Sequence, residues 1–335
     1  MKKLVVLFAI ASIVIFYSCK EGITDPIEPE AGRRDYALNV DTLNNIEIGK
    51  LWGLMPNDIW AIKAYYFQNE LWHFDGSTWN YSKIFYYTPI RTFVGTSPTN
   101  IWLTTHNENS VWLYNGVESE FKFHLEYQDF QQVEINDMNA NAPWNVYGVG
   151  TAVKYSPQSS TNGVILHYDG LKWSYLDIPP IEAVFTNVYT DGKNGVIIKG
   201  HHRGAWEETL WYYENNTLKE IVSSNDYCKI AIINNGVLVS SKKKVYKLDK
   251  GSLIEIIDFK ELQNDIEGIW GRTTSDFFVM VKEGIAHYNG SDLKIICPLD
   301  NTIIEDAIIF DNEVVFAAYS ETNKNTYIIR GKLKE

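Results

Sequence analysis

Four glutamates and one arginine could form a charged binding site, because each follows an apolar residue at the start of a short β-like segment. These residues are Arg91, Glu134, Glu182, Glu267 and Glu305. Carboxylates gathered around one point repel each other unless water, an arginine or a bound cation offsets their charge. The pattern therefore predicts a Ca²⁺ or polar-ligand site. The alternative is a solvated acidic ring whose glutamates face different ways, partly neutralised by Arg91 and by nearby Lys50 and Lys229.

Aromatic side chains concentrate in four loops between the predicted strands. They are Tyr65 and Tyr66, Tyr86 and Tyr87, Tyr127, and Trp206. Such rings could stack on sugars or hold a peptide; alternatively, they cap hydrophobic interfaces and keep their polar atoms in water. The loop with Trp206 also holds His201, His202 and Arg203. We interpret it as a polar ligand-binding loop, because adjacent histidines on a strand point to opposite faces and no third metal ligand follows at a suitable spacing.

No catalytic residue is predicted. The sequence has no G-x-S-x-G, H-E-x-x-H or phosphate-loop motif. Sialidase-like chemistry needs several arginines around one carboxylate, whereas Arg91, Arg203, Arg272 and Arg330 fall in different parts of the chain. A glycosidase needs two carboxylates with different pKa values at one site, which Glu207 or Glu208 opposite one of the four glutamates would supply.

The N-terminal segment predicts export and lipid attachment. Two lysines precede the apolar run of residues 4–17, which is followed by Ser-Cys. This pattern is typical of a secretory signal and is too short for a membrane span. The site resembles the lipobox of bacterial lipoproteins, in which the cysteine, here Cys19, is lipidated. An ordinary signal with a chance cysteine is the alternative. We assign residues 1–18 to a signal peptide and residues 19–34 to a lipidated flexible tether.

Composition restricts the location and the partners. Lys20 after the cysteine, in place of Asp, resembles Gram-negative lipoproteins of the outer membrane, with the body either periplasmic or exposed on the cell surface. We expect membrane contact through the lipid anchor only. The net charge is −12, and loss of two lysines with the signal makes it −14. This acidity argues against nucleic acid as a partner.

A repeated phrase reveals the architecture. LWGLMPNDIWAI at residues 51–62 returns as IWGRTTSDFFVM at residues 269–280. Each begins a unit of four short β-rich runs separated by turn clusters, and Asp-Gly or Asn-Gly pairs suit tight hairpins. Seven such units at about forty-residue spacing predict an all-β, seven-bladed β-propeller of four-stranded antiparallel blades over residues 35–335. The last unit has three strands, so a strand from DYALNVDTL (residues 35–43) should complete it.

Two further cysteines, Cys228 and Cys297, are present in this body. The repeat places Cys228 on an inner strand and Cys297 on the outer strand of the next blade. An exported protein could form a disulfide, but this separation predicts two free thiols.

The repeat resembles that of bacterial lipid-anchored β-propeller proteins, W-G-x-x-x-x-D-[VI]-[WF]-A … H-[YF]-[DN]-G-x-x-W. The matching residues are Trp52-Gly53, Asp58-Ile59-Trp60-Ala61, His73-Phe74-Asp75-Gly76 with Trp79, Trp270-Gly271, and Asp276. The resemblance covers nearly all of the chain after the signal and is strongest in the first, third and sixth units. It implies a propeller on a lipid anchor, in a family that is largely uncharacterised.

Binding in propellers usually uses the face that carries the connections between blades, which we call the top face. We therefore expect a monomeric binding or scaffold module of the cell envelope, with a glycan or an envelope protein as ligand at the top face. A carbohydrate-active enzyme (glycosidase or lyase) with its site at this face is one alternative. An outer-membrane assembly factor that pairs strands with blade edges is another. No cofactor is predicted beyond the Ca²⁺ considered above.

Overall fold

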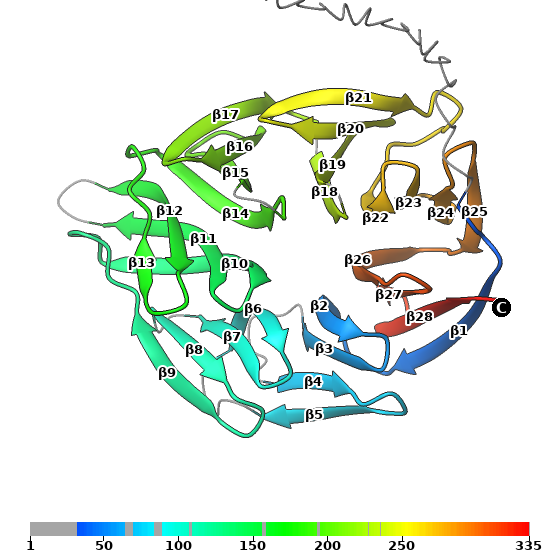
Figure 1. Cartoon of the computed structure of the whole chain (residues 1–335), viewed down its shortest axis with the longest axis horizontal. Helices are drawn as coiled ribbons and strands as arrows, with labels where there is room; N and C mark the ends of the chain where they lie inside the picture. Colours follow the sequence, from blue (N-terminus) through cyan, green and yellow to red (C-terminus); the bar gives the residue numbers. More distant parts are fainter. Residues whose placement is uncertain are drawn as a thin grey trace, which may run out of the picture. The chain divides into compact units, whose positions relative to one another are not determined.

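The protein is a seven-bladed β-propeller, as the repeat predicts. The computed structural model describes residues 32–63, 70–83, 89–106, 109–155, 159–192, 195–226, 228–234 and 236–334. Residues Ala31–Glu335 form one compact unit. Within it, seven four-stranded antiparallel sheets are arranged in a ring around a central axis (Figure 1). Each sheet is one blade, with its first strand nearest the axis.

The strands follow in chain order. Blade one holds β2 (Ile48–Met55), β3 (Asp58–Lys63), β4 (Glu70–Phe74) and β5 (Trp79–Lys83). Blade two holds β6 (Ile90–Ser97), β7 (Asn100–Thr105), β8 (Ser110–Tyr114) and β9 (Ser119–His124), and blade three holds β10 (Gln132–Ala142), β11 (Asn145–Lys154), β12 (Ser160–Tyr168) and β13 (Trp173–Tyr175). Blade four holds β14 (Ala183–Thr190), β15 (Val196–His202), β16 (Glu208–Glu214) and β17 (Thr217–Ser224).

The remaining blades follow the same order. Blade five holds β18 (Cys228–Ile233), β19 (Gly236–Ser241), β20 (Lys244–Asp249) and β21 (Ser252–Asp258). Blade six holds β22 (Gly268–Thr273), β23 (Asp276–Val281), β24 (Gly284–Tyr288) and β25 (Leu293–Pro298), and blade seven holds β26 (Thr302–Ile309), β27 (Glu313–Ser320), β28 (Asn325–Leu333) and β1 (Tyr36–Leu43). Across these described ranges, no segment forms a helix long and apolar enough to cross a membrane.

The N-terminal strand closes the ring. β1 pairs antiparallel with β28 over its whole length, from Tyr36 opposite Leu333 to Leu43 opposite Thr326. It is the outermost strand of blade seven, whose other three strands come from the end of the chain. The predicted closure is therefore confirmed.

The hydrophobic cores lie between blades rather than within them. One core joins Ile48, Ile59 and Trp72 of blade one to Val315 and Ile328 of blade seven. The cores between the other neighbours are built in the same way. A single blade cannot bury both of its faces, which explains why the same hydrophobic pattern returns in every unit.

Both cysteines of the propeller are free thiols, as their positions in the repeat predict. Cys228 begins the inner strand β18, and Cys297 lies on the outer strand β25 of the next blade. Burial raises the pKa of both thiols.

The hairpins within each blade define a second face, opposite the top face. We call it the bottom face: it carries the turns between the first and second strands and those between the third and fourth strands. In blade one, Gly76 of the outer turn lies against Asn57 of the inner turn. Gly76 has a φ of 95°, a conformation that glycine adopts readily. The Asp-Gly and Asn-Gly pairs of the sequence therefore lie at the bottom face.

Candidate binding site on the propeller axis

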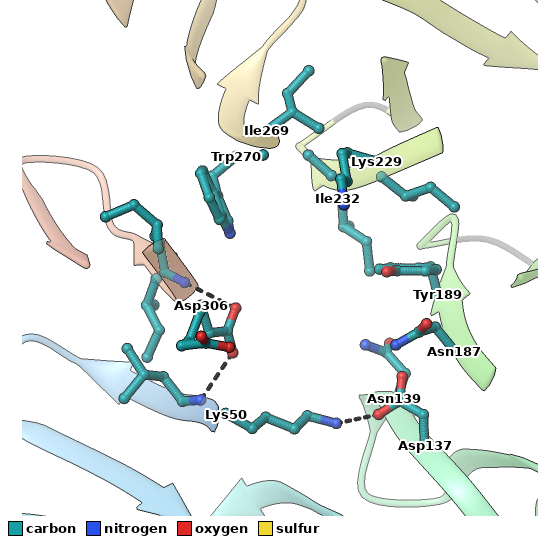
Figure 2. Close-up of a pocket in the computed structure, with 18 of the residues that line it drawn as sticks. Lys50, Asp137, Asn139, Asn187, Tyr189, Lys229, Ile232, Ile269, Trp270 and Asp306 are labelled. Carbon is teal, nitrogen blue, oxygen red and sulfur yellow. Dashed lines mark hydrogen bonds and ion pairs between the residues drawn. The ribbon is translucent and has the colours of Figure 1, made fainter. Parts of the chain in front are cut away.

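A cavity of about 610 Å³ lies on the propeller axis, and residues from all seven inner strands line it (Figure 2). Such a cavity has the size of a small-molecule site. Because every blade contributes to its wall, the side chains around it are held by the rigid part of the fold.

A bulge in the inner strands determines which side chains line this cavity. In the first half of five inner strands, one extra residue stands opposite the second strand of the blade: Gly49, Arg91, Asn136, Thr186 and Glu305. The extra residue changes the direction of the side chains that follow it. In four of these blades the next residue lines the cavity: Lys50, Asp137, Asn187 and Asp306.

Lys50 links three blades on one side of the cavity (Figure 2). Its ammonium group forms an ion pair with Asp137 of blade three and donates to the Met138 carbonyl oxygen at 3.0 Å. It also donates to Thr92 Oγ1 of blade two at 3.2 Å. Asp137 Oδ2 in turn accepts a hydrogen bond from the Val188 amide of blade four at 3.1 Å. This network fixes blades one to four relative to one another.

The acidic side of the cavity belongs to blade seven. Asp306 Oδ2 accepts a hydrogen bond from the Leu51 amide of blade one, and Oδ1 accepts one from the Ala307 amide, both at 2.8 Å. Burial raises the pKa of Asp306 to about 6. The pKa of the neighbouring Glu305 rises to about 7, because the group is partly buried and lies close to Glu47 and Asp306. Blade seven therefore holds two carboxyl groups that resist ionisation.

The opposite side of the cavity carries cations. Lys199 Nζ lies 3.1 Å from Glu208 Oε1, and Glu208 Oε2 accepts a hydrogen bond from the Cys228 amide at 2.8 Å. Burial and the nearby Lys199 lower the pKa of Lys229. Lys229 and Asp306 lie across the cavity from each other (Figure 2). A ligand on the axis would meet carboxyl groups on one side and lysine amino groups on the other.

Apolar side chains separate these charged groups. Ile232 is 38% exposed although it lies on an inner strand, because it faces the cavity. Trp270 also lines the cavity, and its ring packs edge-on against Phe316 at 6.0 Å. The ring lies so close to Gly268 that a Cβ there would be 2.3 Å from it. The cavity therefore combines an indole ring with hydrogen-bonding side chains such as Asn139 and Asn187 (Figure 2).

The structure brings together only part of the predicted charged set. Glu267 and Glu305 line the cavity, whereas Arg91, Glu134 and Glu182 are not among the residues that line it. Arg91 Nη1 forms a 3.0 Å ion pair with Glu134 Oε2. Glu182 is exposed and precedes β14.

The bulge explains this difference. In blade three the extra residue is Asn136, two residues beyond the predicted Glu134. In blade four it is Thr186, four residues beyond the predicted Glu182. Aligning the strands on their first apolar residue therefore missed Asp137, and it stopped one residue short of Asp306. The sequence signal for the cavity-lining position is the Asp or Asn that stands two residues after Ile135, Phe185 and Ile304.

The predicted aromatic loops have different environments. Tyr127 packs against Tyr175 and Phe130, with ring centroids 5.0 Å and 5.6 Å apart, so it caps an interface between blades. Trp206 is 95% exposed. The other tyrosines of the prediction lie outside the described residues: Tyr65, Tyr66, Tyr86 and Tyr87.

The loop that carries Trp206 is attached to the neighbouring blade. Arg203 donates from Nη1 to the Ser159 carbonyl oxygen at 2.9 Å and from Nη2 to Ser159 Oγ at 3.0 Å. His201 is partly buried at the end of β15. His202 Nε2 lies 3.0 Å from Glu220 Oε2. The loop therefore presents Trp206 to solvent on the top face from an anchored base.

No metal centre is apparent in the part of the chain that the structure describes. Among these residues, no three or more His, Cys, Asp or Glu side chains are grouped so that they could hold a metal ion. The glutamates of the predicted Ca²⁺ site are divided between an ion pair (Glu134), an exposed position (Glu182) and the lining of the cavity (Glu267 and Glu305).

Four-stranded blades closed by an N-terminal strand around a lined axial cavity define the class of the protein, a seven-bladed β-propeller. No protein-family model matches the chain, and no curated protein does. Solved structures with the same fold do match. The structure described as YCF48 bound to D1 peptide has a TM-score of 0.64 and 10% identity, covering 91% of this chain and 100% of its own.

Two further structures show the same likeness. YCF48 from Cyanidioschyzon merolae has a TM-score of 0.59 and 11% identity, covering 88% of this chain and 98% of its own. A catalytically inactive virginiamycin B lyase from Staphylococcus aureus, solved with quinupristin, has a TM-score of 0.60 and 10% identity, covering 89% of this chain and 100% of its own. At these identities the likeness is one of fold.

Proposed function

We propose that this protein is a lipid-anchored binding or scaffold module in the envelope of a Gram-negative bacterium, which takes a glycan or a segment of an envelope protein at its top face and axial cavity. The observation that carries the proposal is the cavity itself, with Trp270 on one wall and the hydrogen-bonding side chains of Asn139, Asn187 and Lys229 on others. An apolar surface beside a few polar groups is the usual composition of a ligand site.

Sequence features support the lipid anchor and the outer-membrane location. These are the signal-like residues 1–18, Cys19 in a lipobox-like context, and the resemblance to lipid-anchored bacterial propellers. Replacing Cys19 by Ala should release the protein from the membrane fraction of cells. Unchanged fractionation would reject the anchor.

The exposed ring on the top face and the ring in the cavity support a flat or amphipathic ligand. Trp206 and Trp270 offer stacking surfaces for a sugar or for peptide side chains. One of the similar propellers is described in complex with a peptide and another with quinupristin. These descriptions concern those proteins, and they illustrate the kinds of ligand that propellers of this architecture accept.

A glycan-array screen with residues 31–335 tests the proposal. Two variants separate the two surfaces: Trp206→Ala removes the exposed ring, and Ile232→Trp fills the cavity. Ile254→Ser on the outer strand β21 is the control, because Ile254 is exposed away from the axis. Binding that either variant weakens and the control leaves unchanged would support a glycan ligand. A blank array would direct the search to protein partners by crosslinking in the native membrane.

A second candidate function, a carbohydrate-active enzyme, is favoured by one observation. Glu305, with its pKa raised to about 7, lines the same cavity as Glu267. Glycoside hydrolysis requires two carboxyl groups at a single site, and the one that acts as the acid has a raised pKa. If a glycan binds, its turnover by the wild-type protein and the loss of turnover in Glu305→Gln would support this function. Binding without turnover would reject it.

A further inference from the structure

Four outer turns of the bottom face have the same hydrogen bonds but expose different side chains. In each, the side-chain oxygen of Asp75, Asn115, Asp169 or Asn289 accepts hydrogen bonds from the amides two and three residues ahead. The residue two positions ahead is Ser77 in blade one and Ser291 in blade six. It is Val117 in blade two and Leu171 in blade three. The turn therefore forms equally well with serine, and the apolar residues are not needed to make it.

These apolar side chains also contribute nothing to a core. Val117 is 87% exposed and Leu171 is 91% exposed. Next to Leu171, the inner turn of blade three carries Trp144, which is 65% exposed and lies against Gly170. The corresponding positions beside the turn glycines of other blades hold Asn57, Thr99 and Ser275. Blades two and three thus expose an apolar side chain at the outer-turn position, and blade three exposes another at the inner-turn position, where the other turns named above have polar residues.

The chain enters the propeller on this same face. The Gly32 amide donates to the Asn289 carbonyl oxygen at 2.7 Å, in the outer turn of blade six. Arg34 forms an ion pair with Asp292 of that turn and donates to the His287 carbonyl oxygen at 3.0 Å. From Cys19 to Gly32 the chain advances thirteen residues, which span at most about 45 Å when fully extended. A lipid on Cys19 would therefore hold the bottom face close to the membrane.

We propose that the bottom face of blades two and three is a membrane-contact surface, on which Val117, Trp144 and Leu171 insert into the interface of a phospholipid bilayer. The proposal rests on the lipid anchor proposed above. Tryptophan and leucine on a protein surface are well suited to the boundary between headgroups and acyl chains. The negative charge of the chain makes the attraction apolar rather than electrostatic, so the surface takes zwitterionic lipid.

The position of this surface in the ring would determine how the propeller is oriented on the membrane. Gly32 and Arg34, at the end of the tether, contact blade six, which lies across the ring from blades two and three (Figure 1). Contact at the anchor and contact at the apolar turns would hold the bottom face parallel to the membrane. The top face, with Trp206 and the mouth of the cavity, would then point away from the lipid.

Site-specific labelling on vesicles tests the insertion. Residues 20–335 carry an N-terminal hexahistidine tag in place of the lipid and are bound to phosphatidylcholine vesicles that contain a nickel-chelating lipid. In a Cys228→Ala, Cys297→Ala background, single cysteines at Val117→Cys and Leu171→Cys receive an environment-sensitive fluorophore. Ser77→Cys and Ser291→Cys are matched controls, because they occupy the same position of the same turn.

Insertion predicts a blue shift and about two-fold quenching by brominated phosphatidylcholine at positions 117 and 171, and neither at positions 77 and 291. Labels that report water equally at all four positions would overturn the proposal. A shift that appears without vesicles and grows with protein concentration would also overturn it, because it would mean contact between copies of the chain. Since the tag replaces Cys19, the result is independent of lipidation, which the Cys19→Ala fractionation tests separately.

Discussion

His287 Nε2 lies 2.7 Å from Asp276 Oδ1, and its fully buried imidazole stacks on Phe278. Burial alone would raise the pKa of Asp276, but the hydrogen bond with His287 and the charge of Arg272 outweigh it and lower this pKa. Blade one repeats the arrangement with His73, which lies 2.8 Å from Asp58. The Asp and His residues of the sequence repeat therefore stabilise the blades by hydrogen bonds between strands, rather than forming an acid–base site.

Replacing His287 by Ala should lower the free energy of unfolding by about 2–4 kcal/mol, because it leaves a cavity and removes the buried partner of Asp276. The effect of His73→Ala should be smaller, since the His73 side chain is one-third exposed. Urea unfolding followed by far-ultraviolet circular dichroism measures both. Equal losses in the two variants would contradict the role of burial.

The fold could be predicted from the sequence because its stabilising pattern is local and repeated. Each unit contains the turn residues and apolar runs that predict its own strands. Each core between blades is completed by the next unit along the chain. The missing fourth strand of the last unit even indicated that residues 35–43 would close the ring. The Asp75-Gly76 and Asn115-Gly116 pairs located their turns for the same reason.

The lining of the cavity could be predicted only in part, because a single extra residue in a strand reverses which side chains face the axis. Glu267 and Glu305 fall in the cavity, but the bulge at Asn136 puts Asp137 there instead of Glu134. The position of a bulge depends on hydrogen bonds to the neighbouring blade, such as that from the Val188 amide to Asp137. In the sequence such contacts show only as an Asp or Asn two positions after an apolar residue of the inner strand, as at Asp137, Asn187 and Asp306.

Replacing Gly268 by Ala should destabilise the propeller by about 1–3 kcal/mol, because the added Cβ would collide with the ring of Trp270. The double variant Gly268→Ala, Trp270→Leu should show a smaller loss than the sum of the two single variants, since the collision is then absent. Chemical unfolding of the four proteins gives the coupling. If the losses of stability in the two single variants add up to that of the double variant, the packing of the Trp270 indole does not depend on Gly268.

Deleting residues 35–45 should lower the melting temperature by about 5 °C or more and promote aggregation, because β28 would lose its partner and become an exposed edge. Deleting residues 20–31 is the control, since it removes most of the tether and leaves β1 in place. Differential scanning calorimetry and light scattering measure the two effects. An unchanged melting temperature after loss of β1 would mean that closure by this strand does not stabilise the ring.

Glu305 should make the stability of the protein depend on pH. Its pKa of about 7 in the folded protein lies above the ordinary carboxyl value of about 4 that applies in the unfolded chain. The folded state therefore binds the proton more tightly, and this contribution to stability is present below about pH 4 and is lost as the pH rises towards 7.

Glu305→Gln removes that loss, because the amide stays neutral at every pH. The variant should unfold like the wild type at pH 4.5 and should be more stable at pH 8 by about 1–2 kcal/mol, allowing for the partial exposure of the carboxyl group. Glu182→Gln, at an exposed position of the same face, should change stability little at either pH. Urea unfolding at the two pH values measures the difference. A Glu305→Gln effect of equal size at both would show that this carboxyl group titrates alike in the folded and unfolded chain, and would remove it as the protonated acid required by the enzymatic alternative.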